Sequence, residues 1–111
     1  MAAAQSFKIK VYGKQTHGSR PWSGIDPIVV SAQIINGLQT IISRDTELTK
    51  EAAVISVGLI RGGIRSNIIP EEVEMVGTIR TLDYDMQKKL NAEIKKRVPA
   101  IAEAFGASAT I

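Results

Sequence analysis

Residues 71–90 read EEVEMVGTIRTLDYDMQKKL, and the period of their apolar residues changes midway. Through residues 71–82 apolar and polar side chains alternate, which is typical of a strand with one buried face. From Asp83 onward apolar residues recur at helical spacing, and Asp83 can accept hydrogen bonds from the free N–H groups of a first helical turn. The stretch therefore predicts a half-buried strand that leads into a long helix. We expect the inward strand residues to be Val73, Met75, Gly77 and Ile79, and the helical stripe to be Met86, Leu90, Ile94, Val98 or Ile101, and Phe105.

The same two periods occur once before this stretch. Residues 7–12, FKIKVY, alternate strictly and predict a first half-buried strand. Asp26-Pro27 predicts a helix start, because Asp accepts from the first free N–H groups and Pro fits the first helical position without losing a bonded donor. We expect this helix to span residues 27–44 and to bury a stripe of Ile28, Ala32, Ile35, Leu38 and Ile42.

Two further strands complete the pattern. Residues 53–61 are apolar on both faces, and the C-terminal ASATI predicts the last strand. The order β-α-β-β-α-β, with right-handed crossovers, is that of an α+β ferredoxin-like sandwich, a four-stranded antiparallel sheet with two helices on one face. We expect residues 1–6 to be a disordered or artificial N-terminus and residues 7–111 to form the domain.

This topology places strand 53–61 at an edge of the sheet. The strand carries no proline, no evident bulge and no charge before Arg61, and these are the features that usually protect an edge from pairing. We therefore expect a homodimer in which strand 53–61 pairs with its copy and helix 27–44 lies beside it.

The composition limits what the chain can bind. It has 111 residues, a net charge of +3, one histidine and no cysteine. A zinc or co-catalytic site needs three or more converging ligands per metal, so we expect no metal site in the chain itself. The basic residues are spread along the sequence, which disfavours nucleic acid as a partner. No apolar stretch is long enough for a bilayer and the N-terminus lacks a signal peptide, so we expect no membrane partner and favour the cytoplasm.

Three side chains are candidates for substrate contact. His17 lies in the glycine-rich segment GKQTHGSRPWSGIDP (13–27), either as a donor to a substrate oxygen or as a residue that bonds its own turn. Asn67 either binds a polar group of a ligand or shapes a turn. Arg80 lies on the polar face of its strand, either as a fork for a carboxylate or as a cross-strand partner of Glu72 or Glu74.

These segments resemble a known family. GKQTHGSRPWSGIDPI is similar to the G-K-x-x-H-[GA]-[SA]-x-P-x-x-G-x-D-P-[IV] segment of the M20 metallopeptidases and amidohydrolases, and GGIRSNIIPEEVEMVGTIRTLD is similar to their G-G-x-x-x-N-x-I-P…G-x-x-R-T segment. The resemblance runs from Phe7 to Ile111 and covers only the inserted dimerisation, or lid, domain. The catalytic domain of such enzymes, which holds two metal ions, usually zinc, has no counterpart here. We therefore expect an excised lid domain that folds and associates but does not catalyse.

The resemblance also implies roles for the three candidates. His17 matches the lid histidine that enters the partner subunit's active site and bonds the scissile carbonyl oxygen, or the oxyanion formed from it. Asn67 matches a substrate-contacting asparagine, and Arg80 an arginine that binds a substrate carboxylate. The parent enzyme would cleave C–N amide bonds in peptides or N-acyl amino acids. Trp22 stands where the branch acting on N-acyl amino acids often has a polar residue, and a large aromatic there is expected to line an apolar acyl pocket.

Two alternatives share the expected topology. One is a stand-alone ferredoxin-like regulatory module that binds a small ligand at a dimer interface and does not need His17. The other is an RNA-binding domain, which would require stacking aromatics on the central strands. The outward strand positions offer only Tyr12 for that purpose, so the RNA-binding alternative ranks last.

Overall fold

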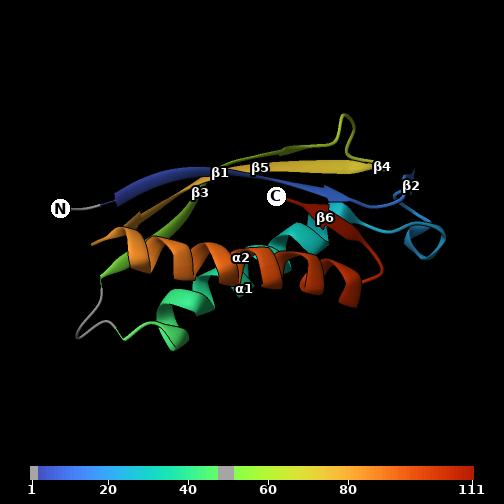
Figure 1. The fold of residues 1–111 in the computed structure, drawn as a ribbon. Helices are drawn as coiled ribbons and strands as arrows, with labels where there is room; N and C mark the ends of the chain where they lie inside the picture. Colours follow the sequence, from blue (N-terminus) through green and yellow to red (C-terminus); the bar gives the residue numbers. More distant parts are fainter. Residues whose placement is uncertain (1–2, 48–51) are drawn as a thin grey trace.

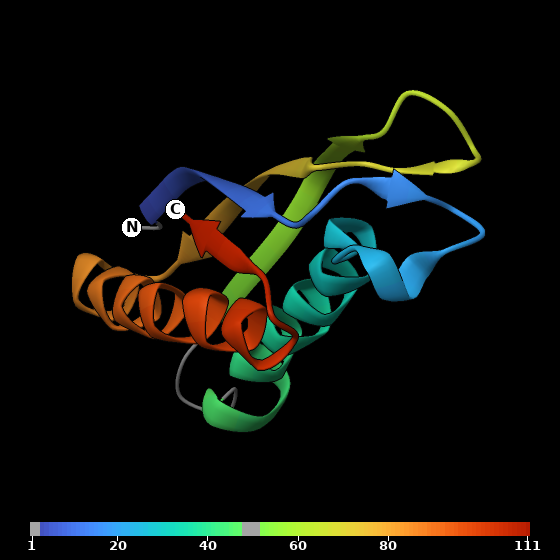
Figure 2. The same cartoon turned by 90° about the vertical axis from the view of Figure 1, so that its right-hand side faces the viewer.

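The computed structural model describes residues 3–47 and 52–111. Its elements are β1 (Ala3–Tyr12), β2 (Thr16–His17), the short 3-10 helix η1 (Pro21–Ser23), α1 (Pro27–Asp45), β3 (Ala53–Gly62), β4 (Ile68–Ile69), β5 (Glu72–Thr81), α2 (Tyr84–Ala104) and β6 (Ser108–Thr110). Strands β3, β5, β1 and β6 form one antiparallel sheet in that order. Both helices cover the same face of the sheet (Figures 1 and 2). The predicted α+β ferredoxin-like fold is confirmed, with β3 at an edge of the sheet as expected.

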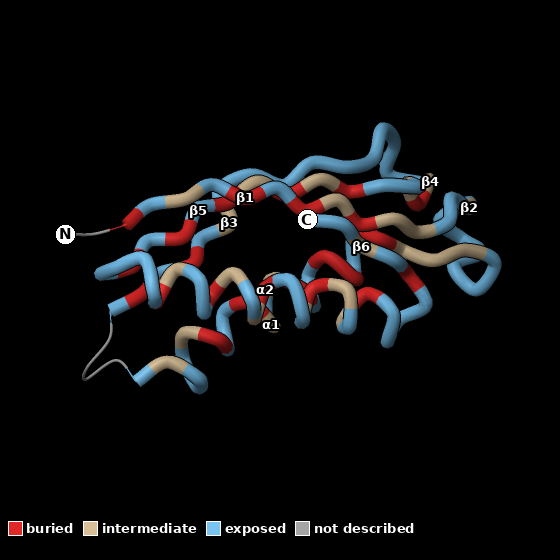
Figure 3. Tube along the Cα trace, viewed as in Figure 1, coloured by how far each residue is buried: buried red, intermediate tan, exposed pale blue. Residues whose placement is uncertain are grey.

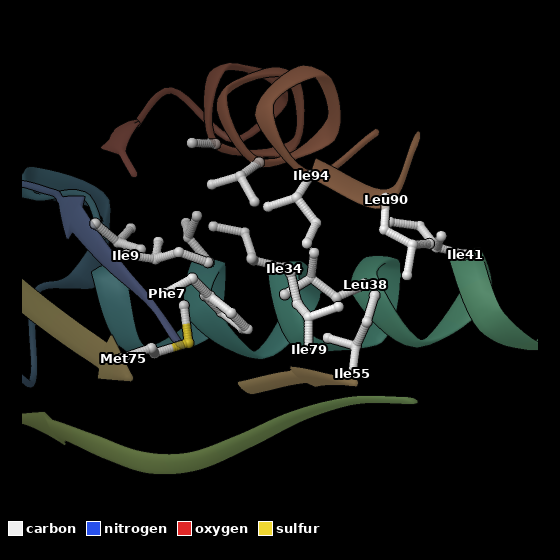
Figure 4. Close-up of a cluster of buried hydrophobic side chains, with 14 of the residues drawn as sticks. Phe7, Ile9, Ile34, Leu38, Ile41, Ile55, Met75, Ile79, Leu90 and Ile94 are labelled. Atoms are coloured by element: carbon white, nitrogen blue, oxygen red, sulfur yellow. The ribbon is translucent and has the colours of Figure 1, made fainter. Parts of the chain in front are cut away.

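The core lies between the sheet and the two helices, where Figure 3 shows the buried positions facing one another. The alternation read from the sequence is confirmed, since the inward residues of β1 and β5 are buried and pack against both helices (Figure 4). Each helix begins as predicted, because Asp26 accepts from the N–H groups of Ile28 and Val29 and Asp83 accepts from that of Met86. On α2 the buried residues are Met86, Leu90, Ile94, Val98 and Ala102, while Phe105 is half exposed.

The buried face of α1 differs from the prediction. The helix buries Val30, Ile34, Leu38 and Ile41, whereas Ile28 and Ala32 are exposed. Apolar residues occupy most of the circumference of this helix, so periodicity alone does not select one stripe. Packing of α1 against α2 selects which apolar stripe of α1 is buried. A Cβ on Gly37 would lie 2.4 Å from Cδ1 of Ile101, so the glycine lets α2 approach closely on that side.

The N-terminal boundary is also different. We predicted disorder for residues 1–6, but β1 begins at Ala3 and residues 3–6 pair with residues 78–81 of β5. The strand runs further than its alternating sequence because the backbone of β5 provides hydrogen-bonding partners along that whole length. Residues 1–2 lie outside the described residues.

Strand β3 is an edge strand, as predicted, but it is not free of bulges. The register with β5 shifts between Val57 and Leu59, which leaves Gly58 as an extra residue. An inserted glycine is easily accommodated there, since a Cβ on Gly58 would meet nothing within 4 Å. Residues 53–57 remain in regular register with β5. The strand also exposes apolar side chains, with Val54 55%, Leu59 41% and Ile60 49% exposed.

The two helices are joined on their outer side by one arginine. Arg97 of α2 bonds Asp45 of α1, Glu93 at 3.1 Å and the hydroxyl of Thr40 at 3.0 Å. The hydrogen bond to the Asp45 carboxylate is the main reason that the pKa of Arg97 lies above its ordinary value. Among the described residues, no helix combines the length and apolar character that a membrane crossing requires.

Candidate functional site

A small antiparallel ribbon joins the two segments that carry His17 and Asn67. In this ribbon, β2 pairs with β4 so that Thr16 lies opposite Ile69 and His17 opposite Ile68. The N–H of Gly18 also donates to the carbonyl of Asn67 at 2.7 Å. Figure 1 places the β2–β4 ribbon at the end of the sheet away from the N-terminus. Sequence analysis predicted only a loop here, because two-residue strands are too short to show a period.

Two glycines allow the His17 loop to fold this tightly. Lys14 and Ile25 exchange backbone hydrogen bonds of 2.8 and 3.0 Å, which brings the loop back onto the start of α1. A Cβ on Gly13 would lie 2.2 Å from the carbonyl oxygen of Ile25, so no other residue fits that approach. A Cβ on Gly18 would lie 3.1 Å from the carbonyl oxygen of Asn67, which is tighter than ordinary contact. The glycines therefore serve close backbone approach, as the sequence indicated.

The His17 ring is exposed and bonds within its own turn. Its Nδ1 accepts from the Ser19 N–H at 3.1 Å and lies 2.8 Å from the Ser19 hydroxyl oxygen. Among the described residues, Nε2 has no hydrogen-bonding partner. The turn-bonding alternative for His17 is thus realised by one ring nitrogen, and the other nitrogen has no partner among the described residues.

Asn67 combines a fixed backbone with an exposed side chain. It lies in a turn in which the Ile68 N–H donates to the carbonyl of Arg65 at 3.3 Å. Its own φ is negative, so it does not use the left-handed conformation that asparagine tolerates. The backbone contact with Gly18 holds it beside the His17 turn. The structure therefore brings His17 and Asn67 together.

Arg80 lies at the other end of the sheet. It is opposite Ala4 on β1 and Val54 on β3, on the exposed face. It follows Glu72 by eight residues of β5, which corresponds to about 27 Å at the usual rise of a strand. One protomer therefore cannot bring His17 and Arg80 to the same small substrate.

The cross-strand ion pair considered for Arg80 does not form. Glu72 pairs with Lys10 and Glu74 with Arg61, each at 3.6 Å. No acidic side chain in residues 3–47 or 52–111 lies within ion-pair distance of Arg80. Small neighbours leave a shallow cavity of about 180 Å³ around it, lined by Ala4, Gln5, Ser6, Thr78 and Arg80. The guanidinium is therefore open to an anion on this face.

Two cavities flank the loop between β3 and β4, and no local sequence pattern indicates them. They have volumes of about 430 and 340 Å³ and share Gly63, Ile64, Arg65, Ile68 and Pro70. Ile64 is 99% exposed at the tip of this loop. Trp22, which we expected to line an apolar pocket, borders neither cavity and is 77% exposed. Exposed apolar surface is therefore provided both by Ile64 in the β3–β4 loop and by Trp22 in η1.

The described residues do not fit a metal centre. They contain no group of three or more His, Cys, Asp or Glu side chains that could hold an ion. With a single histidine and no cysteine in the sequence, the side chains near His17 offer no ligand set. The exposed polar side chains that remain as candidates are His17 and Asn67 at the β2–β4 ribbon and Arg80 at the other end of the sheet.

Comparison with solved structures confirms the fold and shows that this fold forms part of larger proteins. The chain superposes on part of a Staphylococcus aureus protein, provisionally assigned as an aminohydrolase, with a TM-score of 0.91 and 32% identity, covering 98% of this chain and 29% of that one. It also matches a Bacillus subtilis protein described as a dinuclear metal-binding peptidase of the M20 family, with a TM-score of 0.73 and 30% identity over 98% of this chain and 24% of that one.

Curated relatives give the same result. The chain is 40% identical to Thermostable carboxypeptidase 2 of Saccharolobus solfataricus over all of its own length and 28% of the relative. It is 38% identical to N-acetyl-L-cysteine deacetylase of Bacillus subtilis over 97% of its length and 25% of the relative. It thus spans little more than a quarter of these proteins. The family model of the peptidase dimerisation domain matches residues 3–105. The resemblance inferred from the two motifs is confirmed, and the chain belongs to the M20 peptidase dimerisation-domain family.

Proposed function

We propose that this dimerisation domain serves as the lid of a metal-dependent amidohydrolase or peptidase that cleaves C–N amide bonds in peptides or N-acyl amino acids. The names of its relatives, carboxypeptidases and deacetylases, support this substrate class. By this proposal the two divalent metal ions, which we expect to be zinc, belong to the remainder of the parent protein. The domain itself contributes side chains that bind and orient the substrate.

The observation that carries the proposal is the β2–β4 ribbon. It holds His17 and Asn67 side by side at one end of the domain, and it leaves Nε2 of His17 without a partner among the described residues. A hydrogen-bond donor at this position would stabilise the negative charge that develops on the carbonyl oxygen of the substrate. The Asn67 amide would contact a neighbouring polar group of the same substrate.

The position of Arg80 supports a site shared between two protomers. Arg80 lies about 27 Å or more from the ribbon along β5, by the rise of a strand. We propose that each active site uses Arg80 from one protomer, to bind a substrate carboxylate, and His17 with Asn67 from its partner. Such a division requires a symmetric dimer.

The edge of β3 offers the interface for this dimer. Residues 53–57 form a regular edge segment, and the strand exposes three large apolar side chains. Antiparallel pairing of this segment with its copy, with α1 of each protomer alongside, would continue the sheet across the two-fold axis. Monomers usually blunt an edge with charge, proline or a bulge; β3 has a bulge at Gly58 and a charge at Arg61, and residues 53–57 contain neither.

Mixed dimers of two impaired variants, assayed with a carboxylate-bearing substrate well below the wild-type KM, test the shared site. The parent enzyme is prepared as His17→Ala and as Arg80→Ala, and the two are mixed under conditions that allow subunit exchange. A heterodimer then contains one site with both defects and one site with neither. Random exchange at equal amounts should restore about a quarter of the wild-type activity, since half of the dimers are mixed and each has one intact site. Each variant exchanged with itself is the control.

The alternative outcome is equally clear. If His17 and Arg80 of the same protomer served one site, every site in every mixture would carry a defect and no activity would return. If His17→Ala alone retained nearly full turnover, the proposed role of His17 would be wrong whatever the mixtures showed.

A further inference from the structure

We infer that Ser19 is a positioning residue that holds the neutral His17 ring with its proton on Nε2. This inference rests on the proposed function of His17 and deepens it, because it explains how an exposed loop histidine becomes a ready hydrogen-bond donor. Ser19 reaches the ring through its backbone N–H and its hydroxyl, and both lie against Nδ1.

The backbone contact determines the tautomer. A peptide N–H can only donate, so the 3.1 Å bond from Ser19 to Nδ1 requires a lone pair on that nitrogen. In a neutral imidazole one nitrogen carries the proton and the other accepts. The proton therefore lies on Nε2. The Ser19 hydroxyl, 2.8 Å from the same nitrogen, can donate to it as well and reinforces this arrangement.

The turn around the ring is itself fixed from both sides. The Arg20 N–H donates to the carbonyl of His17 at 2.9 Å, which closes the turn that delivers the Ser19 N–H. The Gly18 N–H donates to the carbonyl of Asn67, which ties the turn to the residue just before β4. The donor on Nε2 is therefore set before a substrate arrives, which is the condition under which a hydrogen bond to developing charge is most effective.

The other tautomer would not serve the proposed role. With the proton on Nδ1, the Nε2 lone pair would face the oxygen that gains negative charge, and the interaction would be repulsive. The loss should approach that of removing an oxyanion-hole donor, about 10²–10³ in kcat. Removing the hydroxyl alone leaves the N–H contact in place, so Ser19→Ala should cost only about two- to tenfold in kcat, the range of a single neutral hydrogen bond.

Nitrogen NMR of the chain tests the tautomer directly. The sequence has one histidine, so a ¹⁵N-labelled sample gives one pair of ring signals. Above the pH at which the ring is charged, we expect Nε2 to appear protonated and Nδ1 unprotonated. The chain unfolded in urea gives the reference mixture of tautomers for a free histidine. Ser19→Ala should stay close to wild type, and Ser19→Pro, which lacks both the N–H and the hydroxyl, should shift toward the urea reference.

Folding of each variant is checked by the amide signals of β1 and β5, which lie outside the loop. If Ser19→Pro disrupts the fold, Ser19→Ala and Ser19→Thr decide the matter in the parent enzyme. Ser19→Ala should lower kcat without raising KM, and Ser19→Thr, which restores a hydroxyl, should recover the loss. A purely structural defect would not follow the hydroxyl in this way.

Different results would contradict the role of Ser19 and the proposed role of His17. A wild-type chain with its ring proton on Nδ1, or with the tautomer mixture of the urea reference, would overturn the role of Ser19. In either case a large kcat loss in His17→Ala would leave the proposed function standing. Unchanged turnover in His17→Ala would overturn the proposed function even with the predicted tautomer.

Discussion

Proline substitutions at two adjacent positions of β3 should distinguish the N–H groups that point to the open edge of the sheet from those that bond β5. A Cβ on Gly77 would lie 2.3 Å from the carbonyl oxygen of Ser56, so this carbonyl faces β5. The carbonyl of Ile55 instead accepts from the Gln39 side chain at 2.8 Å and faces away from β5. In an antiparallel ladder the N–H and C=O of one residue point to the same side, and the side alternates along the strand. The N–H of Ser56 therefore bonds β5, and that of Val57 points to the open edge.

The two substitutions should have different costs. Ser56→Pro removes a ladder bond of about 0.5–1.5 kcal/mol and leaves an acceptor on β5 unpaired at a further 1–3 kcal/mol. The combined loss of about 1.5–4.5 kcal/mol is a large share of the 5–15 kcal/mol by which a typical domain is stable. Val57→Pro breaks no bond within the protomer but removes one donor from each side of a symmetric interface. Two donors amount to about 1–3 kcal/mol, or about 5- to 150-fold in the dimer dissociation constant.

Light scattering across a dilution series, together with urea unfolding at fixed concentration, measures both effects. We expect Val57→Pro to dissociate at higher concentration than wild type while its monomer stays folded, and Ser56→Pro to unfold at lower urea. The reverse assignment would refute the strand orientation deduced from Gln39 and Gly77. A wild-type chain that is monomeric at about 100 µM, well above ordinary weak affinities, would refute the interface itself.

Four other outcomes are expected. In the parent enzyme, His17→Ala should lower kcat by about 10²–10³ with little change in KM, measured by steady-state kinetics, and a loss below about tenfold would favour a structural role for the ring. Arg80→Ala should raise KM for substrates with a free carboxylate by the factor that corresponds to a loss of about 1.5–3 kcal/mol of binding free energy. An equal effect on carboxylate-free amides would show that the arginine acts only through its neighbours on the sheet. The 111-residue chain alone should show no amidase activity with or without added zinc, because one histidine cannot hold and activate a metal-bound water; sustained hydrolysis of N-acyl amino acids by the pure chain would contradict this. Arg97→Met should lower the free energy of unfolding by about 1–2 kcal/mol in urea titrations, because the ion pair between Asp45 of α1 and Arg97 of α2 is lost at a partly exposed site. A change below about 0.3 kcal/mol, typical of the weakest exposed pairs, would show that helix packing alone holds α1 against α2.

Several features follow from local sequence alone. The alternation around Phe7 and Met75 predicts both half-buried strands, because successive side chains of a strand point to opposite faces. Asp26 and Asp83 predict the helix starts, because a capping carboxylate bonds N–H groups only two or three residues away. The order of the elements then selects the ferredoxin-like topology. The two motifs of the M20 family could also be found in the sequence, since each is contiguous.

The remaining features depend on contacts between residues far apart in the chain. The buried face of α1 was predicted wrongly because its apolar residues surround the helix, and packing against α2 at Gly37 selects the face. The bulge at Gly58 arises where β3 and β5 lose register, and neither strand shows this alone. The β2–β4 ribbon, the meeting of His17 with Asn67 and the distant position of Arg80 also come from strand pairing. The elements themselves can therefore be predicted from local sequence, because caps and periods act over a few residues. The distances between His17, Asn67 and Arg80 cannot, because they are set by pairing between strands far apart in the chain.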